Sequence, residues 1–308
     1  MKETALNFGQ GGSLVGILTR PDEVQQGDLA VIFLNAGILH RVGPNRIHVR
    51  LARHLADRGV TSLRMDLPGV GDSGMLGTGL SLAEEGRQGI HAAMDLLQRQ
   101  EVASRFVVFG LCSGADAAFQ IACLEPRVVG IALVDPTRLF ATWQSWARKI
   151  LRGALRPAAW LRLFTGRHHV LRRLQRKLGM GPEEQGSEAG PAAGPPAAGD
   201  GRGATALSGE DIQELAREAL RGLVGRDVRI LHVVTGDQSH LYNYRDQFLD
   251  AFPDIGLERV ARLEFFPRAS HTFFRESQRI ELENAMSGWM ASERFPRPTS
   301  SSDGSLGG

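Results

Sequence analysis

The chain has 308 residues, of which 42% are hydrophobic and 23% are charged, and this composition is typical of a soluble globular protein and excludes a wholly disordered or fibrous chain. No apolar run approaches the roughly 20 residues that a membrane-spanning helix needs, and the first twenty residues lack the pattern of a secretory signal. The two cysteines, Cys112 and Cys123, form no disulfide framework or zinc-binding pair, so we expect a cytoplasmic protein.

The first elements in chain order are two short strands, followed by an alternation of strands and helices. Short strands flank a Gly-Gln-Gly-Gly turn, which predicts a hairpin. Apolar runs then alternate with segments of helical periodicity, and short turns join them. This alternation predicts βαβ units, hence an α/β fold with a mostly parallel sheet and helices on both faces. The expected strands are 5–8, 14–19, 30–34, 61–65, 106–109 and 128–134, and the expected helices are 47–58, 81–98 and 113–124.

The alternation is interrupted after residue 135 and resumes at residue 227. We therefore divide the chain into a first core part, 1–135, an insertion, 136–226, and a second core part, 227–295, which is followed by an unstructured tail, 296–308. The insertion is helical at its start and ends in a helix over 208–223, but its Gly-, Pro- and Ala-rich middle, 181–209, is expected to be disordered. The second core part contains predicted strands at 228–235 and 260–266 and predicted helices at 244–252 and 276–290.

The basic residues are unevenly distributed. The net charge is only +2, yet residues 138–177 hold eleven Lys or Arg and no acidic residue. This pattern argues against a general nucleic-acid binder and for one basic segment on a mildly acidic body. An anionic membrane surface, an acidic carrier protein or an anionic substrate would suit the segment. The simpler interpretation is an amphipathic cap whose arginine side chains extend outward.

The strongest chemical signal is Gly110-Leu-Cys-Ser-Gly114, between an apolar strand and a helix of small residues. It has the Gly-x-nucleophile-x-Gly form of a nucleophile elbow, in which a strained turn presents the central side chain above the sheet. The turn would also place the sulfur of Cys112 at a helix N-terminus, which favours the thiolate. A tight turn around a buried thiol is the plainer alternative.

A base and an acid follow in the expected order. His271 comes just after one predicted strand and Asp237 just after another, and an open α/β sheet has its site at these carboxyl ends. Asp237 is the preferred acid, and Asp135, at the end of the strand after the elbow helix, is the competing one. We therefore predict a Cys112, Asp237, His271 triad.

The backbone around the nucleophile should supply an oxyanion hole. One amide is that of Ser113, the residue after the nucleophile, and the others come from the loop after strand 30–34. This loop contains Ala36, Gly37 and Ile38, and its small residues allow the backbone to approach a substrate.

On these motifs the chain resembles the α/β-hydrolase superfamily over nearly its whole length. Asn35-Ala-Gly is similar to the oxyanion loop of the family, and Asp66-Leu-Pro-Gly-Val-Gly-Asp-Ser73 is similar to its D-x-x-G-x-G-x-S turn. Residues 35–46, together with the elbow, resemble hydrolases associated with exosortase and exopolysaccharide systems. The resemblance implies an eight-stranded sheet, a cap formed by 136–226 and, since cysteine replaces the commoner serine, a cysteine-nucleophile enzyme as in dienelactone hydrolases.

The favoured function is hydrolysis of an ester or thioester through a covalent acyl-enzyme, with a small-molecule acyl substrate and no cofactor or metal. Acyl transfer on the same triad is an alternative, and a non-catalytic hydrolase fold that serves a membrane or polysaccharide assembly is another. Gly69-x-Gly71-x-x-Gly74 matches a dinucleotide fingerprint, but no convincing helix follows it directly, so nucleotide binding is disfavoured.

Overall fold

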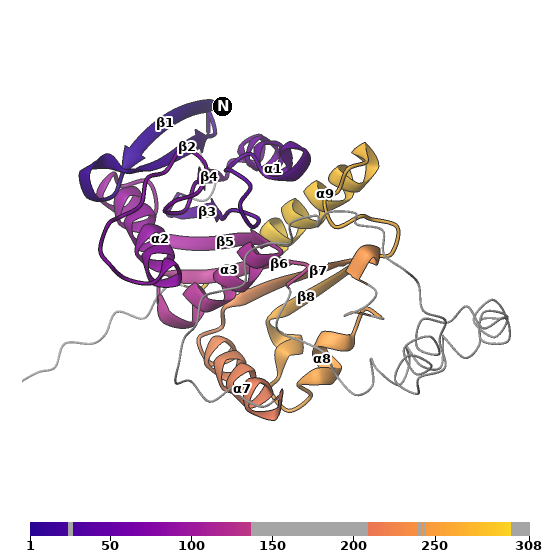
Figure 1. Cartoon of the computed structure of the whole chain (residues 1–308). Helices are drawn as coiled ribbons and strands as arrows, with labels where there is room; N and C mark the ends of the chain where they lie inside the picture. The colour runs from indigo at the N-terminus through magenta and orange to yellow at the C-terminus, as the bar shows by residue number, and fades with distance from the viewer. Residues whose placement is uncertain (24–26, 137–208, 239–241, 243, 297–308) are drawn as a thin grey trace, which may run out of the picture. The chain divides into compact units, whose positions relative to one another are not determined.

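Eight strands form one sheet, in the order β1-β2-β4-β3-β5-β6-β7-β8. The computed structural model (Figure 1) describes residues 1–23, 27–136, 209–238, 242 and 244–296. The strands are β1 (Lys2–Phe8), β2 (Leu14–Arg20), β3 (Leu29–Phe33), β4 (Thr61–Met65), β5 (Arg105–Leu111), β6 (Val128–Val134), β7 (Arg229–Thr235) and β8 (Ala261–Phe266).

Most of the sheet is parallel. β1 and β2 form the predicted antiparallel hairpin, with Phe8 opposite Leu14, and β2 also runs antiparallel to β4. All remaining neighbours, from β4 through to β8, are parallel. The prediction of an α/β fold with a mostly parallel eight-stranded sheet is therefore confirmed. Because parallel strands carry their carboxyl ends at one edge, the loops after β3, β5, β6, β7 and β8 meet there.

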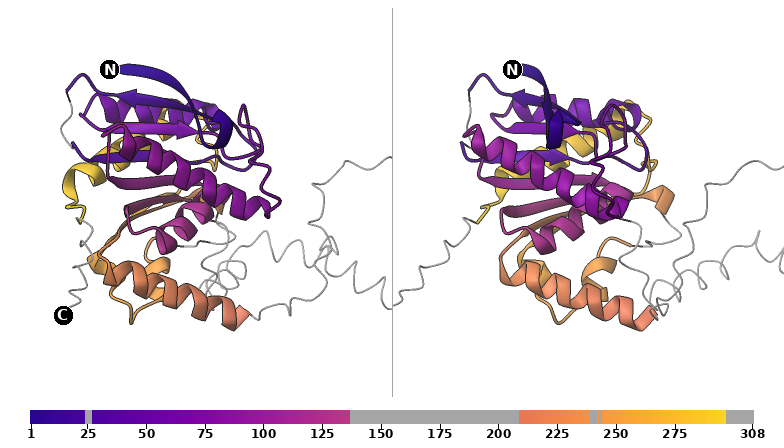
Figure 2. Two further views of the ribbon diagram at one scale, coloured as in Figure 1. Left: turned by 90° about the vertical axis from the view of Figure 1, so that its left-hand side faces the viewer. Right: turned by 60° about the vertical axis from the view of Figure 1, so that its left-hand side comes forward.

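Helices cover both faces of the sheet (Figures 1 and 2). The apolar side chains of α1 and α9 pack in one cluster with residues such as Val31 and Phe109, whereas those of α2, α3 and α7 pack in a second cluster with residues such as Ile32 and Val108. The helices are α1 (Ile47–Ala56), α2 (Leu82–Arg99), α3 (Ser113–Leu124), α7 (Gly209–Gly225), α8 (Gln247–Ala251) and α9 (Glu276–Ser292).

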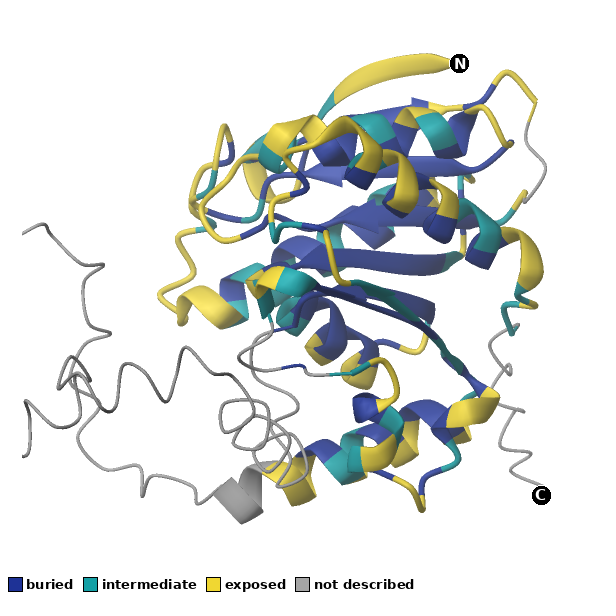
Figure 3. Ribbon diagram, turned by 90° about the vertical axis from the view of Figure 1, so that its right-hand side faces the viewer, coloured by how far each residue is buried: buried dark blue, intermediate teal, exposed yellow. Residues whose placement is uncertain are grey.

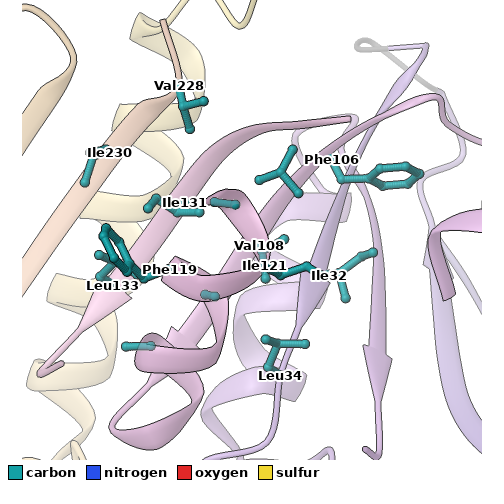
Figure 4. Packing of buried hydrophobic residues seen from close by; sticks show 14 of the residues in the cluster. Ile32, Leu34, Phe106, Val108, Phe119, Ile121, Ile131, Leu133, Val228 and Ile230 are labelled. Carbon is teal, nitrogen blue, oxygen red and sulfur yellow. The ribbon is translucent and has the colours of Figure 1, made fainter. Parts of the chain in front are cut away.

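The central strands are buried on both sides, which explains their continuous apolar sequences. Successive residues of a strand point to opposite faces, so Val107 and Val108 of β5 belong to different clusters. Figure 3 shows the central strands as buried, whereas β1 and the outer helix surfaces are exposed. In Figure 4, Phe119 and Ile121 of α3 lie on the strands beside the elbow. The elbow helix is thus fixed by packing along its length.

The predicted elements agree with the structure to within three residues, and α8 is the one that is shorter than predicted at both ends. The sequence predicts a helix over 244–252, but the helix covers only Gln247–Ala251. Pro253 follows Phe252 and disfavours helical backbone there, and Asp246 already lies at the N-terminal cap. The other boundaries differ by three residues or fewer.

Three sequence predictions fall wholly or largely outside the described residues. These are the basic segment 138–177, the expected disorder over 181–209 and the tail 296–308. Of the proposed cap, 136–226, the described part is Pro136 and residues 209–226, which hold α7. The cap therefore stays a prediction. None of the helices in the described ranges combines the length and the apolar character that crossing a bilayer requires.

Candidate active site

Cys112 occupies a strained turn between β5 and α3. Its backbone has φ 59° and ψ −125°, in a region that residues with a side chain rarely adopt. The turn is closely packed, because a Cβ on Gly110 would lie 2.0 Å from the Gly114 carbonyl oxygen, and a Cβ on Gly114 would lie 2.5 Å from the Asn35 carbonyl oxygen. Glycine at both positions lets strand, helix and the 35–38 loop approach one another. The Cys112 side chain is partly exposed.

His271 lies in the loop after β8, and its ring contacts a carboxylate from the end of β6. The His271 Nδ1 is 2.8 Å from Asp135 Oδ2. The Asp135 carboxylate is fully buried and also accepts hydrogen bonds from the backbone N–H and the hydroxyl of Thr235, both at 2.7 Å. Three hydrogen bonds thus hold the Asp135 carboxylate in one orientation.

The structure corrects the sequence-based preference for Asp237. Asp237 follows β7, as expected, but its carboxylate accepts the backbone N–H of His271 at 2.9 Å, whereas the imidazole contacts Asp135. Asp237 is exposed and anchors the loop that carries the histidine. The competing acid, Asp135, is therefore the one that can orient the imidazole ring.

Gln238 is a further neighbour of the imidazole that the sequence reading did not single out. Its side-chain amide lies 3.2 Å from His271 Nδ1. The only available signal was its place directly after Asp237, in the loop after β7. Gln238 and Asp135 together occupy the Nδ1 side of the ring, which leaves Nε2 for the sulfur of Cys112.

The thiol and the imidazole perturb each other. A hydrogen bond with His271 is the largest cause that lowers the pKa of Cys112, and burial opposes it. The hydrogen bond with Asp135, followed by that with Cys112, raises the pKa of His271 to about 10. Since the sulfur loses its proton before the imidazolium does, the pair can exist as thiolate and imidazolium. This is the reactive form of a cysteine nucleophile.

The predicted oxyanion loop lies against the elbow, but one of its amides is occupied. The Gly37 N–H donates to Ser113 Oγ at 2.9 Å. Gly37 has φ 59° in a turn closed by a hydrogen bond from the Leu39 N–H to the Ala36 carbonyl. Ile38 is 92% exposed, so of the predicted loop residues Gly37 is the one held directly against the elbow.

A buried carboxylate holds the oxyanion loop. Asp66 accepts hydrogen bonds from the Asn35 side-chain amide, the backbone N–H of Arg41 and the backbone N–H of Asp72, and it forms an ion pair with the Arg41 guanidinium. Gly71 faces it so closely that a Cβ there would lie 2.4 Å from its Oδ2. The sequence identified Asp66 only as part of a turn. Apart from Asp72, its hydrogen-bond partners lie 25 or more positions away in the chain.

A small open cavity adjoins the elbow. It has a volume of about 290 Å³ and lies beside Ser113, between α2 and α3. Leu67, Leu82, Ile90 and Ala117 give it an apolar wall, and Asp116 and Arg87 lie at its polar side. A cavity of this kind can hold a short acyl chain.

Nucleotide binding at the Gly69 loop and metal binding are the two cofactor hypotheses that concern the described residues. The Gly69 loop is a turn packed around Asp66, and α2 begins only at Leu82, so the phosphate-binding geometry of a strand, glycine loop and helix is missing there. Within the described ranges, no three His, Cys, Asp or Glu side chains gather to form a metal site.

The fold and the elbow define a class of α/β proteins in which a strand-to-helix turn presents a nucleophile to a histidine and a buried acid. The sequence model described as the alpha/beta hydrolase family matches residues 31–283, and the chain belongs to this family. No curated protein matches the sequence.

Solved structures share the fold at low sequence identity. A dienelactone hydrolase from Anabaena variabilis is 17% identical, with a TM-score of 0.53 over 96% of this chain and 99% of that one. Est1E from Butyrivibrio proteoclasticus is 15% identical, with a TM-score of 0.52 over 93% of this chain and 99% of that one. The Pyrococcus furiosus esterase Pf2001 is 14% identical, with a TM-score of 0.52 over 94% and 90%. At these identities the likeness concerns the fold.

Proposed function

We propose that the protein hydrolyses an ester or thioester through a Cys112, His271, Asp135 triad. The observation that carries this proposal is the chain of contacts from the strained Cys112 to His271 and from His271 Nδ1 to the buried Asp135. A charged buried carboxylate fixes the tautomer of the imidazole and stabilises the imidazolium. The esterases and the dienelactone hydrolase of similar fold agree with this class of reaction.

The first half of the reaction forms a thioester on the enzyme. The Cys112 thiolate attacks the carbonyl carbon, a C–S bond forms, and the carbonyl oxygen becomes an oxyanion. The backbone amides of Ser113, at the start of α3, and of Gly37 are the donors that stabilise this oxyanion. The Gly37 amide becomes available once Ser113 Oγ has moved away from it. The intermediate then expels the leaving group, which takes the proton of His271 Nε2.

The second half releases the acid. His271, now neutral, accepts a proton from water, and the hydroxide attacks the thioester carbon. The C–S bond breaks, the carboxylic acid leaves, and the thiolate and imidazolium are restored. An alcohol or amine in place of water would give acyl transfer through the same steps, so acyl transfer is the second outcome that this site allows.

An intact-mass experiment tests the proposal. The protein is incubated with activated ester, lactone and thioester probes, and the modified residue is located by peptide mapping. We expect an acyl adduct on Cys112 that forms in the Cys123→Ser control, fails to form in Cys112→Ala and decays with release of the acid. An intact protein that stays unmodified by all three probe classes at neutral pH would refute the enzyme and favour a non-catalytic role.

A further inference from the structure

A second cavity lies between α1 and the N-terminal turn of α9, and arginines surround it. Its volume is about 600 Å³, and its lining includes Arg46, Arg50, Arg53, Arg279, Asn45 and Phe274. The triad, the oxyanion loop and the acyl cavity described above do not use these residues. Four guanidinium groups in one cavity form a marked concentration of positive charge.

The charges of the cavity are only partly neutralised. Arg50 is paired with Glu276 and Glu283, and Arg53 shares Glu3 with Arg64. Arg46, by contrast, is exposed, and its guanidinium has no hydrogen bond or ion pair within the described part of the chain. Arg279 is paired with Glu276 through Nη2, and its buried Nε–H finds no acceptor among the described residues. Three of the four guanidinium groups thus have carboxylate partners, and Arg46 is the one that an anionic oxygen ligand in the cavity could pair with.

The backbone at the cavity is strained. Asn45 has φ 50° and Arg46 has φ 60°, two consecutive residues in the left-handed region without a glycine. Such strain persists where the surrounding structure fixes it, and it is concentrated at binding and catalytic sites. Here it sets the Arg46 side chain at the first turn of α1, beside Arg50.

One wall of the cavity is formed by the loop after β8, which carries His271. The Asn45 side-chain amide donates to the Thr272 carbonyl at 2.9 Å, and Thr272 directly follows His271. Arg279 donates to the carbonyls of Phe273 and Phe274, at 3.1 and 2.7 Å. A ligand in this cavity would therefore contact the same loop as a substrate held at Cys112.

Phosphate fits this chemistry better than a carboxylate does. A phosphate group offers several oxygens and carries up to two charges, which guanidinium forks at different angles can share. Glu276 and Glu283 occupy the nitrogens of Arg50, so the unpaired Arg46 is the guanidinium that remains for the phosphate. Phe274, 56% exposed, offers an apolar surface for the part of the ligand attached to the phosphate.

We propose that the cavity between α1 and α9 binds a phosphate group on the leaving-group portion of the substrate. This inference rests on the proposed hydrolase and narrows its substrates to esters or thioesters whose alcohol or thiol carries a phosphate. The acyl group would lie at the elbow, and the phosphate at Arg46.

The test compares two acyl thioesters that differ only in the phosphate, one of pantetheine and one of 4′-phosphopantetheine. We expect the wild-type kcat/KM to favour the phosphorylated thioester by about tenfold, the factor that one good charged contact supplies. Arg46→Gln should reduce this ratio to near one, mainly through KM. Arg99→Gln, which removes an exposed arginine from the end of α2, is the matched control and should keep the wild-type ratio.

Pyrophosphate binding, measured as a rise in thermal midpoint, separates the outcomes. Stabilisation of the wild type and of Arg99→Gln but not of Arg46→Gln supports an anion site even if neither thioester is hydrolysed, in which case only the hydrolase proposal fails. Equal hydrolysis of the two thioesters by the wild type overturns the assignment to the substrate. In that case pyrophosphate binding identifies a site for a free anion, and no pyrophosphate binding removes the site altogether.

Discussion

Asp135 and His271 are 136 positions apart in the chain and meet at 2.8 Å, Oδ2 to Nδ1, at the carboxyl edge of the sheet. Asp135 has φ 48° directly after β6, and the two donors of Thr235 on β7 hold its carboxylate. The acid of the candidate triad is thus fixed by a neighbouring parallel strand.

Substitution of the two aspartates should give very different losses. Asp135→Asn should lower kcat/KM for an ester substrate by about 10²- to 10⁴-fold. The His271 ring then loses the carboxylate that fixes its tautomer when neutral and stabilises it when protonated. Asp237→Asn keeps a side-chain oxygen that can accept the backbone N–H of His271, and it should cost less than about tenfold. Steady-state kinetics of the two variants measure both losses. A larger loss in Asp237→Asn than in Asp135→Asn would identify Asp237 as the acid.

Alkylation should distinguish the two cysteines. His271 lowers the pKa of Cys112, whereas desolvation raises the pKa of Cys123, so iodoacetamide should react faster with Cys112. The rate at Cys112 should rise with pH through a midpoint below the ordinary thiol value, and His271→Ala should move this midpoint upward. Peptide mapping over a pH series measures both sites. Equal rates at the two cysteines, or a midpoint that His271→Ala leaves unchanged, would contradict the thiolate and imidazolium pair.

Turnover should be lost at alkaline pH through the histidine. The pKa of His271 is raised to about 10, so its proton is present below this pH and absent above it. Because the imidazolium protonates the leaving group, kcat/KM should fall as the pH rises through about 10. Asp135→Asn removes the main cause of the raised pKa and should move this decline to lower pH. A decline at the same pH in both proteins would assign it to another group.

Removal of the Ser113 hydroxyl should free an oxyanion donor. In Ser113→Ala the Gly37 N–H loses its internal acceptor, and the roughly 1 kcal/mol of that hydrogen bond no longer opposes substrate binding. We expect acylation to be faster by about fivefold, measured by a stopped-flow burst with an activated ester. A loss of tenfold or more would mean that the hydroxyl itself positions the loop or contacts the oxyanion.

Substitution of the buried carboxylate of Asp66 should lower the stability of the fold. Asp66→Asn leaves the Arg41 guanidinium with only its exposed partner, Asp72, and sets an amide N–H₂ or a neutral oxygen against several donors. We expect a loss of about 3 kcal/mol in the free energy of unfolding, within the range for breaking a buried pair. Urea denaturation measures it. Asp72→Asn, which alters the exposed partner of Arg41, is the control and should cost less than about 1 kcal/mol.

The fold and the strained turn at Cys112 could be predicted because their signals are local. Runs such as Val128–Val134, buried on both faces, and the turn around Gly110 and Gly114 depend on residues close together in the chain. Helix α8 was predicted too long, since Pro253 limits it at one end and non-helical backbone before Gln247 at the other.

The sequence by itself determined the α/β sheet, the elbow with Cys112 and the histidine that follows β8, because strand periodicity, small-residue turns and strand ends are all written in adjacent residues. The tertiary structure decided which acid meets the imidazole. Asp135 and Asp237 both end parallel strands and look equivalent in sequence, but the burial of Asp135 and the two donors of Thr235 turn its carboxylate toward the ring. The tertiary structure also decided that Ser113 Oγ meets the Gly37 amide and that Asp66 holds the oxyanion loop. Such contacts join distant segments, and only the packing of strands and loops brings them together.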